Sequence, residues 1–138
     1  MVSARFYLFG IIVWVILAIL TISFAIFREV IFIPFSGLDG TVARAVLLPV
    51  AIAYVLIVAY LFLRRQVDYT QRDTVFVGLM WLVLTIVFEF SFGTLVMGNT
   101  LEMLLYDYNI FAGRTWVFFL LTTTIAPFVV HKYILKRA

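Results

Sequence analysis

The chain has no cysteine and only one histidine, and these shortages exclude several classes of functional site. Without cysteine there can be no disulfide, thiolate nucleophile or sulfur-ligated metal. A single histidine, His131, is too few for a zinc or haem site within one chain, so we expect no metal and no cofactor. Glycine-rich phosphate loops and nucleophile elbows are also missing from the sequence. We therefore expect a protein without catalytic activity, although an enzyme remains open.

Charged residues are scarce and apolar residues abundant. Of the 138 residues only 12% are charged, whereas 66% are hydrophobic. Soluble domains are nearer half apolar and a quarter charged, and a soluble chain of this length could not bury so much apolar surface. The composition therefore predicts a membrane protein with lipid as its solvent. We expect no nucleic-acid partner, because membrane orientation accounts for the net charge of +3.

Four long apolar runs predict an all-α, polytopic membrane protein with four transmembrane helices in a single domain. We expect these helices at about residues 6–27, 45–63, 74–95 and 115–135. The first run is 22 residues long and would extend over roughly 33 Å, enough to cross a bilayer. Arg5 and residues 23–25 give this run some likeness to a signal peptide, but its apolar core is too long for one.

Basic residues divide unequally between the two sides of the predicted bundle. Seven lie at the N-terminus, the middle loop and the C-terminus, and three lie at the other two connections. Because lysine and arginine collect on the cytoplasmic side, both termini are predicted to be cytoplasmic, in a bacterial inner membrane. The middle loop at residues 64–73 alternates in charge sign and is expected to be a solvated cytoplasmic turn.

The two outward connections are predicted to hold more than simple turns. In the first, Pro34 lacks an N–H and disfavours helix at Ile33. Residues 30–35 should therefore lie in the interface or dip back into the bundle. In the second, Asn99 is followed three residues later by a glutamate, which resembles a capping box. A short interfacial helix is expected there, at about residues 100–107.

The two halves of the chain carry similar patterns. LTISF at residues 20–24 matches LTIVF at 84–88, and alanine–arginine at 43–44 matches glycine–arginine at 113–114. These matches suggest a repeat of two hairpins related by an axis along the membrane normal. Chance similarity remains the alternative, because the matches are short and use few residue types.

Charges near the predicted outer surface form the candidate site, because ionised groups at membrane depth are costly. Glu89 lies deepest and needs either a partner or a proton. Arg44 and Arg114 are the outward-side cations able to hold it with two parallel hydrogen bonds. The full candidate cluster, for ligand binding or for structure, comprises Arg28, Glu29, Arg44, Glu89, Asp107, Asn109 and Arg114.

Members of this cluster also have structural interpretations. A buried pair between Glu89 and an arginine can hold helices together without binding a ligand. Arg28 and Glu29 can reach headgroup water from the end of a helix. Arg114 can instead capture a lipid phosphate. A dyad of Asp107 with Glu89 is the arrangement that would indicate catalysis.

The fourth predicted helix contains two further polar features. Pro127 removes one backbone hydrogen bond, and nearby threonines can satisfy the freed groups, which predicts a structural kink rather than a transport hinge. His131 lies one turn farther and is expected at the membrane interface, with a proton relay as the alternative.

Three stretches in the second half resemble a pattern in a group of small four-helix bacterial inner-membrane proteins. They are FEFSFG at 88–93, LLYDYN at 104–109 and GRTW at 113–116. The matching positions include Glu89, Asp107, Asn109, Gly113 and Arg114. The group has no assigned activity, so the resemblance implies fold and location only. Motifs of small multidrug exporters and fluoride channels are not found in the sequence.

Two functional hypotheses follow. The first is a module that binds or transports a small polar, anionic or lipid-like ligand at the carboxylate–arginine cluster. The second is a non-catalytic accessory subunit or assembly factor of a larger membrane complex. Expected partners are membrane lipids, a small amphiphile, and further copies of the chain or other subunits.

Overall fold

A computed structural model of the chain describes residues 4–106, 108–109 and 114–137. Over these residues the fold is helical, without strands, which confirms the predicted all-α class. Four helical stretches are long and apolar enough to span a membrane, as predicted. They are Ala4–Ser36, Gly40–Leu63, Gln71–Leu95 and Trp116–Ile134. A short helix, α5 at Leu101–Tyr106, lies between the third and fourth stretches.

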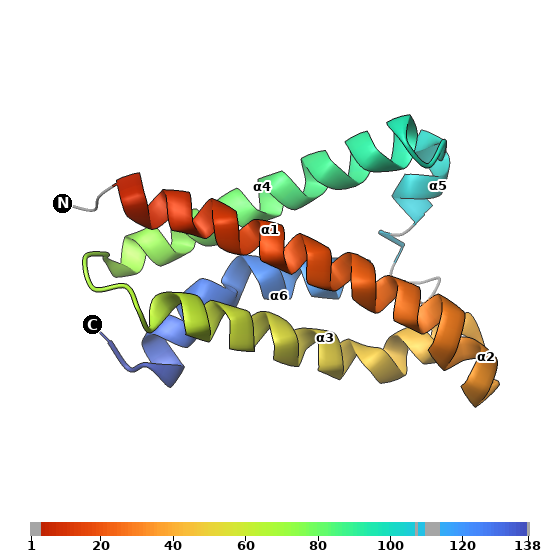
Figure 1. The fold of residues 1–138 in the computed structure, drawn as a ribbon, viewed down its shortest axis with the longest axis horizontal. Helices are drawn as coiled ribbons and strands as arrows, with labels where there is room; N and C mark the ends of the chain where they lie inside the picture. The colour runs from red at the N-terminus through yellow and green to blue at the C-terminus, as the bar shows by residue number, and fades with distance from the viewer. Residues whose placement is uncertain (1–3, 107, 110–113, 138) are drawn as a thin grey trace.

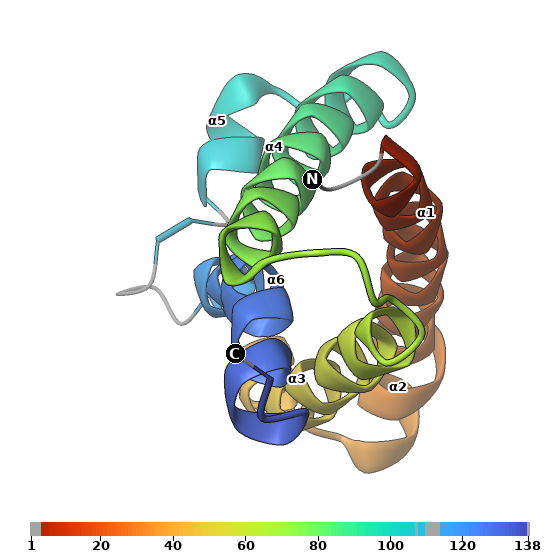
Figure 2. The ribbon, with the colours of Figure 1, turned by 90° about the vertical axis from the view of Figure 1, so that its left-hand side faces the viewer.

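The four long helices form a closed bundle. They are α1 (Ala4–Phe27), α3 (Gly40–Leu63), α4 (Gln71–Leu95) and α6 (Trp116–Val129). Helix α1 contacts α3 and α4, and α6 contacts the same two helices (Figure 2). Both chain ends and the α3–α4 connection lie together at one end, here called the terminal end (Figure 1). The opposite end, here called the distal end, carries α2 (Ile33–Ser36) and α5.

Helix α1 ends at residue 27, but the helical stretch does not end there. It continues through a π-helical turn at Arg28–Phe32 into α2, and ends at Gly37, which adopts a left-handed conformation with φ 73°. The prediction that Pro34 disfavours helix at Ile33 is wrong. Pro34 lies in the first turn of α2, where a missing N–H costs little. The π turn lets the N–H of Ile33 donate to the carbonyl of Arg28, five residues back.

The short helix α5 begins with a different cap from the predicted one. Thr100, rather than Asn99, accepts a hydrogen bond from the backbone N–H of Met103, at 3.2 Å. The N–H of Asn99 donates instead to the carbonyl of Gly93 at 2.8 Å, which folds the chain back over the end of α4. Thr100 therefore caps α5 in place of Asn99, because Asn99 is part of the turn that ends α4.

Helices α4 and α6 pack with their backbones in close contact. A Cβ added to Gly78 would lie 1.9 Å from the carbonyl oxygen of Thr124, so only glycine allows this approach. Nearby, the fully buried Trp81 donates from Nε1 to the carbonyl of Gly10 at 2.9 Å, which ties α4 to α1. These contacts fix the terminal half of the bundle.

The segment from Arg64 to Arg72 is mostly exposed, as expected of a solvated turn, whereas Asp73 in the first turn of α4 is buried. Thr70 and Asp73 form a capping box at the start of α4, and the Asp73 side chain is only 8% exposed. Its carboxylate also accepts a hydrogen bond from the Tyr7 hydroxyl of α1 at 2.5 Å. Asp73 is buried because its carboxylate caps α4 and also accepts a hydrogen bond from α1. The sequence pattern showed only alternating charges.

His131 is buried rather than interfacial, which corrects the prediction. It is 1% exposed and lies in a π-helical turn at Val130–Ile134 that follows Pro127. Its Nδ1 lies 3.1 Å from the hydroxyl of Tyr69, a residue of the α3–α4 connection that covers the imidazole. Arg137 donates to the same hydroxyl at 2.9 Å and to the carbonyl of Leu63. The connection and the C-terminal segment therefore close the terminal end together.

Candidate functional site at the distal end

Three arginines from three parts of the chain line one cavity at the distal end. Arg28 lies in the π turn after α1, Arg44 in the first turns of α3, and Arg114 just before α6. The cavity has a volume of about 150 Å³. Arginine stays charged at any physiological pH, so this lining carries three permanent positive charges. Among the described lining residues there is no carboxylate.

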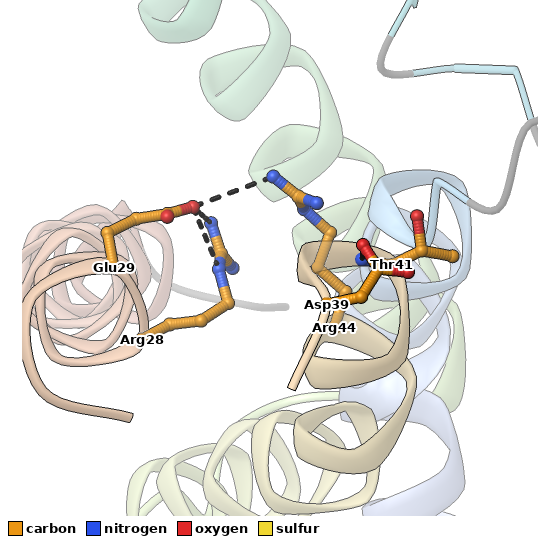
Figure 3. A network of polar contacts seen from close by, with 5 residues as sticks. All are labelled: Arg28, Glu29, Asp39, Thr41 and Arg44. Carbon is orange, nitrogen blue, oxygen red and sulfur yellow. Dashed lines mark hydrogen bonds and ion pairs between the residues drawn. The ribbon is translucent and has the colours of Figure 1, made fainter. Parts of the chain in front are cut away.

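Glu29 bridges two of these arginines from the side. One of its carboxylate oxygens lies 3.4 Å from Nε of Arg28 and 3.5 Å from Nη2 of Arg44, so it links the α1 extension to α3 (Figure 3). Its side chain is half exposed, and such pairs contribute about 0–1 kcal/mol. Glu29 therefore helps to hold Arg28 and Arg44 beside each other at the edge of the cavity.

The rest of this cavity wall is aromatic and hydroxylic. The hydroxyls of Thr21 on α1 and Tyr54 on α3 lie 3.0 Å apart within hydrogen-bonding distance. Thr21 also donates to the carbonyl of Leu17 at 2.7 Å. Phe119 and Trp116 of α6 form the neighbouring part of the wall. Because Thr21 donates to Leu17, the Tyr54 hydroxyl is the donor in their contact, and both hydroxyl hydrogens are used within the wall. The attraction of the cavity for an anion therefore comes from its arginines.

Glu89 lies next to this cavity and is held by two aromatic donors. One oxygen of its carboxylate accepts hydrogen bonds from the Tyr108 hydroxyl at 2.7 Å and from Trp116 Nε1 at 2.8 Å. The side chain is partly buried. Both of these donors are neutral, so the predicted pairing of Glu89 with an arginine stays a prediction.

A second, apolar cavity of about 290 Å³ lies between α1, α4 and α6. Trp14 Nε1 donates to Thr85 Oγ1 at 3.0 Å and joins α1 to α4, and toward the distal end the two helices diverge (Figures 1 and 2). Apolar side chains such as Leu17, Phe88 and Phe92 line the space between them. Four residues line both cavities, namely Thr21, Ala25, Trp116 and Phe119.

Arg114 and Asn109 also make contacts at the edge of the site. Arg114 stacks over the Tyr106 ring at 5.3 Å, and its backbone N–H donates to the carbonyl of Asn109 at 3.4 Å. Asn109 is exposed and borders a shallow surface hollow beside α5. Asp107 and Gly113 lie outside the described residues.

Of the predicted cluster, Arg28, Arg44 and Arg114 thus line one cavity with Glu29 beside two of them, and Glu89 lines the adjoining cavity. Sequence reasoning missed Trp116, Tyr108 and Tyr54 as polar contributors. Trp116 lies two residues after Arg114, and Tyr108 lies next to the predicted interfacial helix, and at such positions aromatic residues are typical of the membrane interface. Buried tyrosine and tryptophan need a hydrogen-bond partner, but the sequence does not show which partner each of these residues has.

The described residues contain no group of three or more histidine, cysteine, aspartate or glutamate side chains that could hold a metal ion. Comparisons of the chain with protein families, curated proteins and solved structures found no match. The function is therefore argued from the geometry of the distal end.

Proposed function

We propose that the chain is a multi-pass protein of a bacterial inner membrane whose distal end faces outward. We propose that it binds or transports a small anionic or lipid-like ligand at that end. The single observation that carries this proposal is the convergence of Arg28, Arg44 and Arg114 on one cavity. Three permanent cations lie together at the distal end, where the bundle otherwise exposes few charged groups.

Placement in the membrane is supported by the surface of the bundle. The four long helices expose large apolar side chains along their length, as in Ile19 at 59%, Val83 at 58% and Ile57 at 57%. Water disfavours such a surface, whereas hydrocarbon does not. The terminal end carries most of the lysines and arginines, which favours a cytoplasmic location for both chain ends.

The preference for an anion follows from electrostatics. Arginine forms paired hydrogen bonds to carboxylate and phosphate oxygens, and such charge-assisted bonds are roughly twice as strong as neutral ones. A partly enclosed cavity reduces screening by water, so the interaction is stronger than at an open surface.

The direct test is titration of inorganic phosphate into the protein purified in digitonin, a detergent without phosphate groups. We expect saturable binding that weakens about tenfold or more in Arg44→Gln, because a charge-assisted hydrogen bond contributes about 1.5–3 kcal/mol. Arg72→Gln is the matched control, since Arg72 is exposed at the terminal end.

Wild-type protein that binds no phosphate, or an Arg44→Gln variant that binds as well as Arg72→Gln, would exclude the proposal. Co-purification of other membrane proteins at fixed stoichiometry, together with that result, would favour the accessory-subunit role. The arginines would then serve to hold α1 and α3 together through Glu29.

A further inference from the structure

We infer that a groove between α1 and α3, in the terminal half of the bundle, binds one membrane phospholipid with a net negative head group. The inference goes beyond the proposed function, because it concerns the opposite end of the bundle and different arginines. It is carried by a surface groove that is apolar along its length and has Arg65 at its terminal end.

The groove is open to the surroundings of the bundle. Helices α1 and α3 lie side by side (Figures 1 and 2), and the groove between them has a volume of about 510 Å³, within the range of ligand-binding clefts. Phe62 is buried at its base, whereas Ile16 and Leu61 line it with 47% of each residue exposed. In a membrane these exposed side chains meet the hydrocarbon chains of lipids.

The chemistry and the length of the groove suit one hydrocarbon chain. Six of its eight described lining residues are apolar, namely Phe9, Val13, Ile16, Val58, Leu61 and Phe62. Along α1 the residues from Arg5 to Ile16 rise by roughly 16 Å, which is about half of the hydrocarbon thickness of a bilayer. The groove therefore matches the depth of one leaflet, with its charged end at the head-group level.

Arg65 supplies a positive charge at that end. It is exposed and lies two residues after the end of α3. Within the part of the chain that the structure describes, its side chain has no ion pair, and Asp68, the nearest carboxylate in the sequence, is not paired with it. Gln66 lies beside it in the lining, and its amide can donate to the ester carbonyls of a lipid.

Arg5 adds a second positive charge from the α1 side. Its guanidinium lies 5.3 Å from the centroid of the Phe9 ring, and Phe9 lines the groove. Arg5 is exposed, so this contact places its charge beside the groove without burying it. Basic pockets between transmembrane helices are typical sites for anionic lipids. Cations from two helices at one end of an apolar groove therefore favour an anionic head group over a zwitterionic one.

The test is native mass spectrometry of the protein in digitonin with equal amounts of phosphatidylglycerol and phosphatidylcholine. Both lipids carry the same deuterated chains, so they differ in the head group and are distinguished by mass from lipids that come from the cell. We expect one bound phosphatidylglycerol per chain at saturation. Its affinity should be at least fivefold higher than that of phosphatidylcholine, because each arginine near the head group contributes about fivefold.

Arg65→Gln tests the charge at the end of the groove. We expect this variant to lower the preference for phosphatidylglycerol about fivefold. Arg72→Gln is the matched control, since it removes the same charge from an exposed position at the same end of the bundle, outside the groove lining. It should retain the preference of the wild-type protein.

Ile16→Trp tests the apolar part of the groove. The larger side chain should occupy the space of several methylene groups and weaken the binding of both lipids about tenfold or more, without changing the preference between them. Ile19→Trp is the matched control, because Ile19 is also exposed on α1 but does not line the groove. It should bind both lipids as the wild-type protein does.

The outcomes also separate this inference from the proposed function. Equal binding of the two lipids, or equal preference in Arg65→Gln and Arg72→Gln, would overturn the inference. Dimers that form in digitonin and dissociate in Ile16→Trp would also overturn it, because a second copy of the chain would then fill the groove. Arg44→Gln should leave phosphatidylglycerol binding unchanged, so the two proposals fail in different variants.

Discussion

At the scale of single residues, Glu89 illustrates how a partly buried carboxylate can be stabilised by aromatic donors. Trp116 Nε1 and the Tyr108 hydroxyl both donate to the same oxygen, from positions 27 and 19 residues along the chain. The contact joins α4 to the start of α6 and to the segment after α5. Glu89 therefore helps to shape the shared wall of the two cavities whether or not it meets the ligand.

Glu89→Gln should fold but lose stability. The amide oxygen can still accept from Trp116 and Tyr108, but two charge-assisted bonds become neutral ones, at a cost of about 2 kcal/mol in total. Thermal unfolding in detergent, followed by the near-ultraviolet circular dichroism of tryptophan, measures the change. Glu102→Gln, at an exposed position on α5, should be nearly neutral. Equal stability of the two variants would show that the Glu89 hydrogen bonds contribute nothing.

The sequence identified Glu89 by its depth in an apolar run, because a charge there needs compensation. It could not identify Trp116 and Tyr108 as the donors, because the contact depends on how α5 and the start of α6 fold back over α4. The convergence of Arg28, Arg44 and Arg114 likewise depends on the continued helix beyond residue 27. That continuation carries Arg28 toward Arg44 (Figure 3).

At the scale of helices, the closest contact in the bundle is between α4 and α6. Gly78→Ala should destabilise the protein by about 3 kcal/mol or more, because the added Cβ meets a backbone carbonyl that cannot rotate away. Unfolding by increasing dodecyl sulfate in mixed micelles provides the measurement. Gly40→Ala is the control, since its Cβ would meet only the flexible end of the Arg44 side chain at 3.1 Å. A Gly78→Ala variant as stable as this control would contradict the close packing.

Long apolar runs were sufficient to predict four helices able to span a membrane, because run length alone decides this. The π-helical turns at Arg28–Phe32 and Val130–Ile134 were not predictable in the same way. Each π-helical turn lies near a proline, Pro34 or Pro127. The sequence shows that the proline lacks an N–H, but it does not show which carbonyls the neighbouring N–H groups contact instead. Thr21 and Thr85 of the suggested repeat both donate to a carbonyl four residues back, yet the repeat itself remains a prediction.

At the scale of the whole molecule, the bundle has two unlike ends. The terminal end is closed by Tyr69, His131 and Arg137, whereas the distal end holds both cavities of the proposed ligand site. We propose that the distal end faces outward. If so, the site is open to the outer leaflet and to the space beyond it.

Cysteine labelling tests this orientation without background, since the chain has no native cysteine. In intact cells a membrane-impermeant maleimide should label Ser36→Cys beside α2 and should not label Asp68→Cys in the α3–α4 connection. Both positions are exposed in the folded chain. Lysed cells should show labelling of both variants, which controls for reactivity. The reverse pattern in intact cells would place the arginines on the cytoplasmic side.

Native mass spectrometry of the gently extracted protein tests the central claim most directly, because it reports bound ligands and partner chains together. We predict a chain that carries one small anionic amphiphile, and we predict that Arg44→Gln loses this added mass while Arg72→Gln retains it. A folded chain with no added mass, or one associated only with other proteins, would contradict the account.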